Sequence, residues 1–298
     1  MSKRKTPLSL NICWLQGRFG LEKSLEMTAK AGFDEIDYSL EPGDALQTPG
    51  NIWMSDAWEE EAHRVRELAL SYGLPITQIH TPFIFRGGDK LEYAENVMVP
   101  TINRSLDIAA VLGAKTAVQH RFFRQALRKV VEHADEVGVT LCLENGWGRD
   151  AKRGLCIASH DLSVCGPSTP ESHLEYIKLV GSEKTRACLD TGHAALPING
   201  PELWEYIHGL GKDMLQALHV QDNNMRGNDE HKFPFFGAIE WEKVAKALGE
   251  IDYEGSFTYE AYGLIGGNMP DEFAPTAVKY AADIGHFLCD IIDENRPK

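Results

Sequence analysis

Histidines and carboxylates stand at the ends of short apolar runs along most of the chain. In order, they are His80, His120, Glu144, Asp190 with His193, His219 and Glu260. An Asp-x-His pair, Asp229 and His231, closes the polar stretch HVQDNNMRGNDEH that begins at His219. Gathering several carboxylates without a cation would be unfavourable, because like charges repel and raise one another's pKa values. The pattern therefore predicts a bound divalent metal ion.

Four of these side chains suit a single metal ion: Glu144, Asp190, His219 and Glu260. Three carboxylates and one imidazole form an oxygen-rich set of ligands, which suits Mn²⁺, Mg²⁺ or Co²⁺ and would also accept Zn²⁺. A catalytic ion of this kind keeps coordination positions open for the oxygen atoms of a substrate. We therefore expect one divalent metal ion as the cofactor.

The apolar runs alternate with helical stretches from end to end. Their composition predicts strands over 8–13, 35–40, 75–80, 116–120, 139–145, 185–190, 215–220 and 256–260. Apolar residues spaced i, i+3, i+4, i+7 predict helices, for example over 126–137 and 276–292. This alternation predicts an α/β fold, a (β/α)8 TIM barrel forming a single domain over 1–298. The segment CWLQGRFG after the first strand lacks the glycine pattern that an open doubly wound sheet would need.

The composition limits the kinds of partner that we expect the protein to bind. With 30 basic and 44 acidic residues the formal charge is −14, which argues against nucleic acid because phosphate backbones bind basic surfaces. The N-terminal segment lacks the cleavage pattern of a signal peptide, and no apolar run reaches the roughly 18 residues of a membrane span. The six cysteines include no C-x-x-C pair and indicate reduced thiols. We expect a cytoplasmic protein with a small-molecule substrate and no membrane partner.

Motifs around the expected ligands carry a family resemblance. The segments LCLENG (141–146), CLDTGHA (188–194), LHVQDN (218–223) and TYEAY (258–262) resemble the xylose-isomerase-like TIM-barrel superfamily. The resemblance extends from AGFDEIDY (31–38) to the last strand. This superfamily contains sugar (phosphate) isomerases and epimerases as well as the endonuclease IV group of DNA-repair enzymes. Homo-oligomers are frequent among its members, so the resemblance also implies a homo-oligomer.

The resemblance implies a role for individual residues. Glu144, Asp190, His219 and Glu260 would bind the metal, and Glu144 and Glu260 would also be the catalytic acid and base. His193 and Arg226 would contact the substrate. Epimerising a ketose requires proton removal next to a carbonyl through an enediolate, which a metal stabilises while two carboxylates exchange the proton. We interpret the protein as a divalent-metal-dependent isomerase or epimerase of a sugar, a sugar phosphate or a keto-polyol.

Further side chains near strand ends are expected to complete the site. His80, His120 and Trp14 would contact the substrate, and Phe19 and Trp147 could stack on a sugar. Many isomerase-like members carry P-G-E-G after the Asp-x-His pair, whereas this chain reads KFPFFGAIEW over 232–241. Because of that departure, we expect the aromatic rings of Phe235 and Phe236 to lie near the barrel mouth.

Two alternative functions share these residues. The endonuclease IV group binds three zinc ions, and its additional ligands correspond in pattern to His80, His120, His193, Asp229 and His231. A trinuclear-zinc phosphodiesterase or AP endonuclease is the first alternative, although no loop of interleaved basic and aromatic residues is evident to hold DNA. Without extra metal, Asp229 and His231 would orient His219 or its loop. A dehydratase is the second alternative, because an enolate beside a leaving hydroxyl can eliminate.

Overall fold

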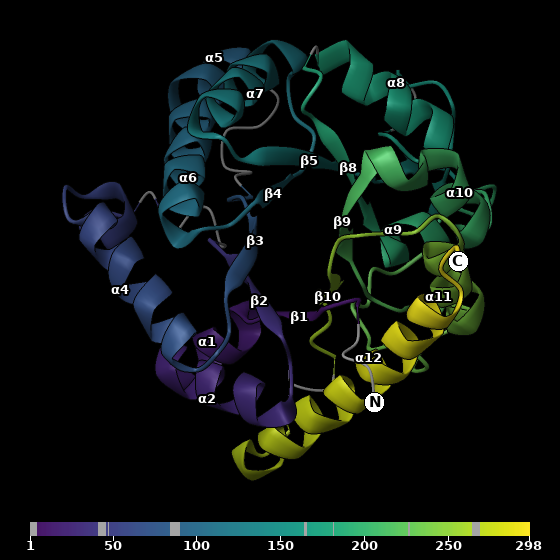
Figure 1. Ribbon diagram of the computed structural model, residues 1–298. Helices are drawn as coiled ribbons and strands as arrows, with labels where there is room; N and C mark the ends of the chain where they lie inside the picture. The colour runs from purple at the N-terminus through teal and green to yellow at the C-terminus, as the bar shows by residue number, and fades with distance from the viewer. Residues whose placement is uncertain are drawn as a thin grey trace.

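Eight parallel strands form a barrel in the computed structural model of the protein (Figure 1). The structure describes residues 5–40, 46, 48–83, 90–163, 166–180, 182–225, 227–263 and 269–298. The strands, in the order in which they are hydrogen-bonded, are β10 (Phe257–Tyr259), β1 (Leu8–Asn11), β2 (Glu35–Ser39), β3 (Ile76–His80), β4 (Thr116–Gln119), β5 (Thr140–Glu144), β8 (Arg186–Asp190) and β9 (Leu215–His219). A parallel bridge between Val220 and Tyr259 joins the two ends of this order. The expected (β/α)8 TIM barrel is confirmed.

Most of the helices surround the barrel on its outside (Figure 1). They are α1 (Cys13–Phe19), α2 (Leu21–Ala31), α4 (Trp58–Ser71), α5 (Leu91–Tyr93), α6 (Val99–Leu112), α7 (Arg124–Val137), α8 (Pro170–Val180), α9 (Thr191–Ala195), α10 (Leu203–Met214), α11 (Trp241–Glu250) and α12 (Ala274–Glu294), with the short segments η1 (Ile52–Met54), η2 (Ala94–Met98) and η3 (Asp271–Phe273). The helices expected over 126–137 and 276–292 correspond to α7 and α12, which bury apolar faces against the barrel. None of the described helices is long and apolar enough to span a membrane.

Side-chain alternation along the strands determines which residues point into the barrel. Four small side chains, Val118, Cys142, Cys188 and Ala217, form a cluster separate from the main hydrophobic core. Their neighbours in sequence, such as Leu141 and Leu143, belong to the main core. Because successive side chains point to opposite faces of a strand, the four small side chains face the barrel interior. The residues two positions further on face the interior for the same reason: His120, Glu144, Asp190 and His219.

An antiparallel hairpin interrupts the alternation of strands and helices after β5. It consists of β6 (Gly148–Asp150) and β7 (Leu155–Ile157). The sequence pattern does not predict it, because strands of three residues are too short to show a hydrophobic period. The hairpin follows the carboxyl end of β5 and so belongs to the loops at the mouth of the barrel.

Candidate active site

Four ligand-type side chains converge at the mouth of the barrel. Glu144, Asp190 and His219 are the last residues of β5, β8 and β9, and Glu260 directly follows β10. One ligand atom from each lies within 4.8 Å of the others. Nδ1 of His219 lies 3.3 Å from Glu144 Oε1 and 3.3 Å from Glu260 Oε2. The structure thus brings together the four residues expected to bind one metal ion, which we call the acidic cluster.

Buried polar atoms without hydrogen bonds mark the centre of the acidic cluster. Within the described residues, both carboxylate oxygens of Glu144, Oδ2 of Asp190 and both ring nitrogens of His219 have no hydrogen bond of suitable geometry. Imidazole nitrogens nevertheless lie 3.0 to 3.3 Å from the two Glu144 oxygens, as ion-pair contacts. The other oxygen of Asp190 accepts a hydrogen bond of 2.7 Å from the amide of His193 and thereby caps α9. Unsatisfied buried polar groups are destabilising, and a divalent cation between them would satisfy them. The oxygen-rich donor set fits Mn²⁺, Mg²⁺ or Co²⁺.

Burial and neighbouring charges shift the acid–base properties of the cluster. Burial raises the pKa of Asp190 to about 7, although His193 opposes the shift. Burial disfavours the charged form of His219, but the carboxylates of Glu260 and Glu144 outweigh it and raise the pKa of His219 well above its usual value. Burial likewise disfavours ionised Glu144, but His120 and His219 outweigh it and hold the pKa of Glu144 well below its usual range. An incoming cation would therefore displace protons from Asp190 and His219.

Asp37, in the middle of β2, lies behind His219. Its Oδ2 is 3.6 Å from Nε2 of His219, the ring nitrogen that does not face the glutamates. The same oxygen accepts hydrogen bonds from Asn11 Nδ2 at 3.3 Å and from Gln78 Nε2 at 3.1 Å. A carboxylate behind a metal-binding imidazole orients the ring and increases its basicity. At 3.6 Å the contact is an ion-pair distance and not a hydrogen bond, and Asp37 is the carboxylate placed to support His219 if that ring binds a metal.

The substitution Asp37→Asn is expected to weaken Mn²⁺ binding about 10- to 100-fold, because it removes the charge that orients His219. Mn²⁺ titration of metal-free protein measures this affinity. Asp56→Asn, an exposed site outside the cavity, serves as the control. An unchanged affinity in Asp37→Asn would show that His219 needs no such support.

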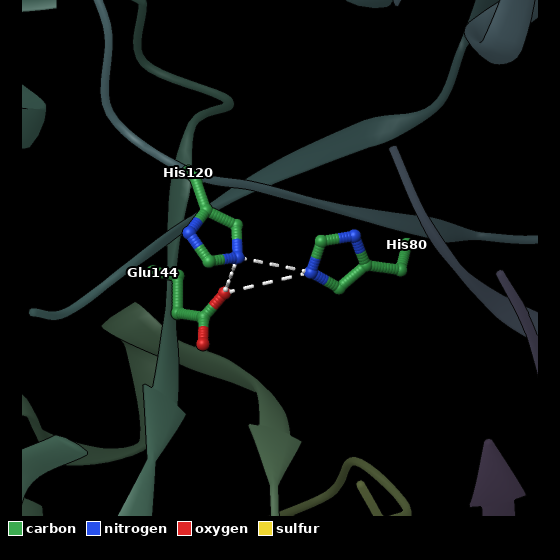
Figure 2. Close-up of side chains that lie close together, drawn as sticks. All are labelled: His80, His120 and Glu144. Carbon is green, nitrogen blue, oxygen red and sulfur yellow. Dashed lines mark hydrogen bonds and ion pairs between the residues drawn. The ribbon is translucent and has the colours of Figure 1, made fainter. Parts of the chain in front are cut away.

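His80 and His120 extend the acidic cluster on one side of Glu144. Nε2 of His120 lies 3.0 Å and Nε2 of His80 lies 3.8 Å from Glu144 Oε2 (Figure 2). The two Nε2 atoms are 3.1 Å apart. Nδ1 of His80 donates a hydrogen bond of 2.7 Å to the carbonyl of Thr81, which leaves its Nε2 as an acceptor. Ligand atoms of these three side chains lie close enough together to hold a second cation.

His193, Asp229 and His231 form a further group of this kind. Oδ2 of Asp229 lies 3.1 Å from His193 Nε2 and 3.3 Å from His231 Nε2. Its Oδ1 accepts a hydrogen bond of 2.6 Å from Gln221 Nε2. The Gln221 side chain crosses Gly192, where a Cβ atom would lie only 2.1 Å from it, so position 192 must lack a side chain. The structure thus also gathers the residues that correspond to a three-metal site.

Asp222 holds the loop that carries Asp229 and His231. Its carboxylate is fully buried and accepts hydrogen bonds of 2.8 to 3.2 Å from the backbone amides at 223, 237 and 239 and from the indole of Trp241. No local motif indicates this role, because the donors lie up to 19 residues further along the chain. The Asp222 carboxylate therefore holds the loop around Asp229 and His231 together with the backbone pairing of Asp222 and Lys232.

The substitution Asp222→Ala is expected to lower the free energy of unfolding by roughly 3–5 kcal/mol, because several buried donors lose their acceptor at once. Urea unfolding followed by fluorescence measures the change, with Asp56→Ala as the control. A loss below about 1 kcal/mol, typical of a surface site, would contradict the role given to Asp222.

The ligand-type side chains open into a cavity of about 1160 Å³. Trp14 is 51% exposed at its rim and stacks on Tyr262, with ring centroids 4.3 Å apart. Tyr262 in turn stacks on His231 at 4.6 Å, and Trp147 lies 4.7 Å from His193. Trp14 and Trp147 therefore line the cavity as expected. Tyr262 was not anticipated, and its place two residues after Glu260 is the signal that would have indicated it.

Three aromatic residues lie elsewhere than expected. Phe19 packs against the hydrophobic core and does not belong to the described lining of the cavity. Phe235 and Phe236 lie against α12, their rings 6.3 Å from Phe287 and 6.1 Å from Tyr280. The expectation for these two rested on a missing family motif, whereas contact with α12 shields part of each ring from water. Arg226, expected to contact the substrate, lies outside the described residues.

Fold and site together define a TIM barrel with a candidate metal centre at the carboxyl ends of its strands. The chain belongs to the xylose isomerase-like TIM barrel family, whose profile matches residues 25–284. An uncharacterized protein of Methanocaldococcus jannaschii is 26% identical over 286 residues, which cover 87% of this chain and 88% of that protein. A ketose 3-epimerase of Arthrobacter globiformis is 21% identical over 263 residues, which cover 82% and 78%.

Solved structures share the barrel. A D-tagatose 3-epimerase-like protein superposes with a TM-score of 0.69 at 21% identity, covering 97% of this chain and 98% of that one. A D-psicose 3-epimerase crystallised in the presence of D-fructose superposes with a TM-score of 0.70 at 16% identity, covering 95% and 99%. At these identities the likeness supports the fold.

Proposed function

We propose that this protein is a divalent-metal-dependent isomerase or epimerase of a sugar, a sugar phosphate or a keto-polyol. The observation that carries the proposal is the acidic cluster, whose ligand atoms lie within 4.8 Å of one another and whose members Glu144 and Glu260 line the cavity. The relatives named ketose 3-epimerase and D-psicose 3-epimerase support a sugar as substrate.

The two glutamates are placed to move a proton on one substrate. A divalent cation held by the acidic cluster would polarise a carbonyl group and stabilise the charge that develops when a neighbouring C–H proton is removed. Glu144 and Glu260 come from strands on different sides of His219, and each has an oxygen 3.3 Å from its Nδ1. One carboxylate would accept the proton on one side of the substrate carbon, and the other would return a proton on the opposite side.

His80 lies between these two carboxylates. Its Nε2 is 3.8 Å from Glu144 Oε2 and 3.9 Å from Glu260 Oε1. Because Nδ1 carries the hydrogen, Nε2 is an acceptor, and a substrate hydroxyl could donate to it in place of His120, whose Nε2 lies 3.1 Å away. His80 would thus orient the substrate between acid and base.

The experiment that tests the proposal follows proton exchange with solvent. Protein loaded with Mn²⁺, Co²⁺ or Mg²⁺ is incubated in D₂O with a panel of ketoses, ketose phosphates and keto-polyols, and the products are observed by NMR. Deuterium at the carbon next to the carbonyl, with formation of an isomer or epimer, is the expected result. Formation of a dehydrated product would assign the site to elimination instead. No exchange with any compound would overturn the proposal.

A phosphodiesterase is the second candidate, and one observation favours it. Besides the acidic cluster, the group of His80, His120 and Glu144 and the group of His193, Asp229 and His231 have metal-binding geometry. Metal content per chain, measured on protein purified without chelator, distinguishes the two. About one equivalent of Mn²⁺, Co²⁺ or Mg²⁺ is expected for the isomerase. Close to three equivalents of Zn²⁺, with cleavage of a phosphodiester, would favour the second candidate.

A further inference from the structure

A second cavity, of about 900 Å³, adjoins the cavity of the acidic cluster. The two share Phe83, His120 and Arg121 in their walls. The second cavity is formed by the segment that links β4 to α7, by the start of α7, and by Tyr176 and Leu179 of α8. A substrate whose reacting carbon lies at the acidic cluster would reach the second cavity by passing these shared side chains.

The second cavity is basic, in contrast to the chain as a whole. Arg121, Arg124 and Arg128 line it, and no described aspartate or glutamate does, whereas the chain carries a net charge of −14. Arg128 donates a hydrogen bond of 2.9 Å to the carbonyl of Leu179. The side chains of Arg121 and Arg124 form no ion pair or hydrogen bond with the described part of the chain. Within those residues, no carboxylate neutralises the two guanidinium groups that line the cavity.

A side chain at position 166 would crowd the end of the Arg121 side chain. A Cβ atom at 166 would lie 3.1 Å from Nε, 3.2 Å from Cδ and 3.3 Å from Cζ of Arg121. These distances are tighter than ordinary van der Waals contacts, so even a methyl group would press on the arginine. Gly166 therefore lets the Arg121 side chain lie against the loop before α8, between the two cavities.

We propose that Arg121 and Arg124 bind an anionic group of the substrate, a carboxylate or a phosphate, in the second cavity. This inference rests on the proposed function and names the substrate class of the same site. Paired guanidinium groups bind carboxylates and phosphates through charge-assisted, often bidentate hydrogen bonds. Even with a divalent cation bound, the three carboxylates of the acidic cluster leave a formal charge of −1 there, and Asp229 adds another negative charge, so this end of the site disfavours the anion. The charge distribution therefore sets the substrate's orientation, with its keto group at the acidic cluster and its anionic group at the arginines.

The test compares each neutral ketose with its phosphate ester and with the corresponding keto-sugar acid, using metal-loaded protein. The quantity measured is the preference ratio, which is kcat/KM for the anionic substrate divided by kcat/KM for the neutral one. This ratio is expected to fall roughly tenfold to a hundredfold in Arg121→Gln and in Arg121→Gln/Arg124→Gln, because charge-assisted hydrogen bonds are lost. Arg64→Gln removes one positive charge on α4, outside both cavities, and is expected to leave the ratio unchanged. Gly166→Ala keeps every charge and is expected to lower the ratio by a smaller factor.

A second measurement does not depend on turnover. Thermal-shift titration of metal-free protein with inorganic phosphate, at constant ionic strength, is expected to show saturable stabilisation in the wild type and in Arg64→Gln. The double variant Arg121→Gln/Arg124→Gln is expected to lose it. Equal stabilisation of wild type and double variant, or its absence from both, would overturn the anion site.

The two measurements separate the inference from the proposed function. Phosphate binding that depends on the arginines, without turnover of any compound, would leave the anion site standing and remove the isomerase proposal. If neutral ketoses are turned over but no arginine variant changes the ratio of the kcat/KM values, the isomerase proposal stands and the anion site is overturned. Arginine-dependent preference for the phosphate ester or for the sugar acid identifies which anion the cavity accepts.

Discussion

Glu144→Gln and Glu260→Gln are each expected to lower turnover by about 10²- to 10⁴-fold, the usual contribution of a general acid or base. The amide retains the size of the side chain but cannot take up the substrate proton. Both positions also belong to the acidic cluster, so metal content must be measured for each variant. Turnover is measured on the best substrate of the ketose panel at saturating Mn²⁺. The control is Glu67→Gln, a substitution of an exposed residue on α4.

Solvent exchange distinguishes a proton-transfer role from a loss of metal. If each carboxylate serves one side of the substrate carbon, Glu144→Gln stops deuterium exchange into one epimer and Glu260→Gln stops it into the other. A defect caused by lost metal would abolish both exchanges together. Near-normal rates in either variant, with metal bound, would remove that residue from the mechanism.

Metal removal is the second change with a large expected effect. Chelation with EDTA is expected to abolish turnover and to lower the melting temperature, because it leaves Glu144, Asp190 and His219 with unsatisfied buried atoms. A metal present at 100 times its dissociation constant contributes about 2.7 kcal/mol, which corresponds to a shift of roughly 5 °C in a domain of this size. Thermal unfolding with EDTA, and again after adding Mn²⁺, measures the shift. An unchanged melting temperature with full activity would contradict a metal centre.

The same titration has an expected dependence on pH. Burial raises the pKa of Asp190 to about 7 in the metal-free protein. The carboxylates of Glu260 and Glu144, acting against burial, raise the pKa of His219 well above its usual value. Both groups must lose a proton before they bind a cation. Between pH 7 and pH 6 the protonation of His219 raises the dissociation constant about tenfold, because its pKa lies above this range. Asp190 is half protonated at pH 7 and adds about fivefold, so the two together give about a fiftyfold change. A dissociation constant that stays constant over this range would exclude Asp190 as a ligand.

The barrel and the gathering of ligands could be predicted from the sequence because both follow from local periodicity. Side chains alternate along a strand, so a small residue such as Cys142 in the interior places Glu144 at the mouth. Because the strands are parallel, their carboxyl ends lie at the same end of the barrel, and this does not depend on the loop conformations. The family motifs lie in these same segments, which is why the expected ligand residues converge.

Contacts between distant segments could not be predicted in this way. Asp222 accepts a hydrogen bond from Trp241, and Asp37 lies behind His219, although neither pair shares a local pattern. The rings of Phe235 and Phe236 lie on α12, and Phe19 lies against the core, because each aromatic side chain packs on whichever apolar surface the fold brings to it.

The sequence by itself therefore determined the fold class and the residues that meet at the mouth, since strand periodicity and ligand type are properties of short segments. Only the tertiary structure decided which distant residues contact these side chains and which cavity lies beside them. The arginines beside the second cavity show why. Arg121 and Arg124 are ordinary charged residues in the sequence, and only the packing of α7, α8 and the loop at Gly166 places them in the wall of a cavity that adjoins the cavity of the acidic cluster.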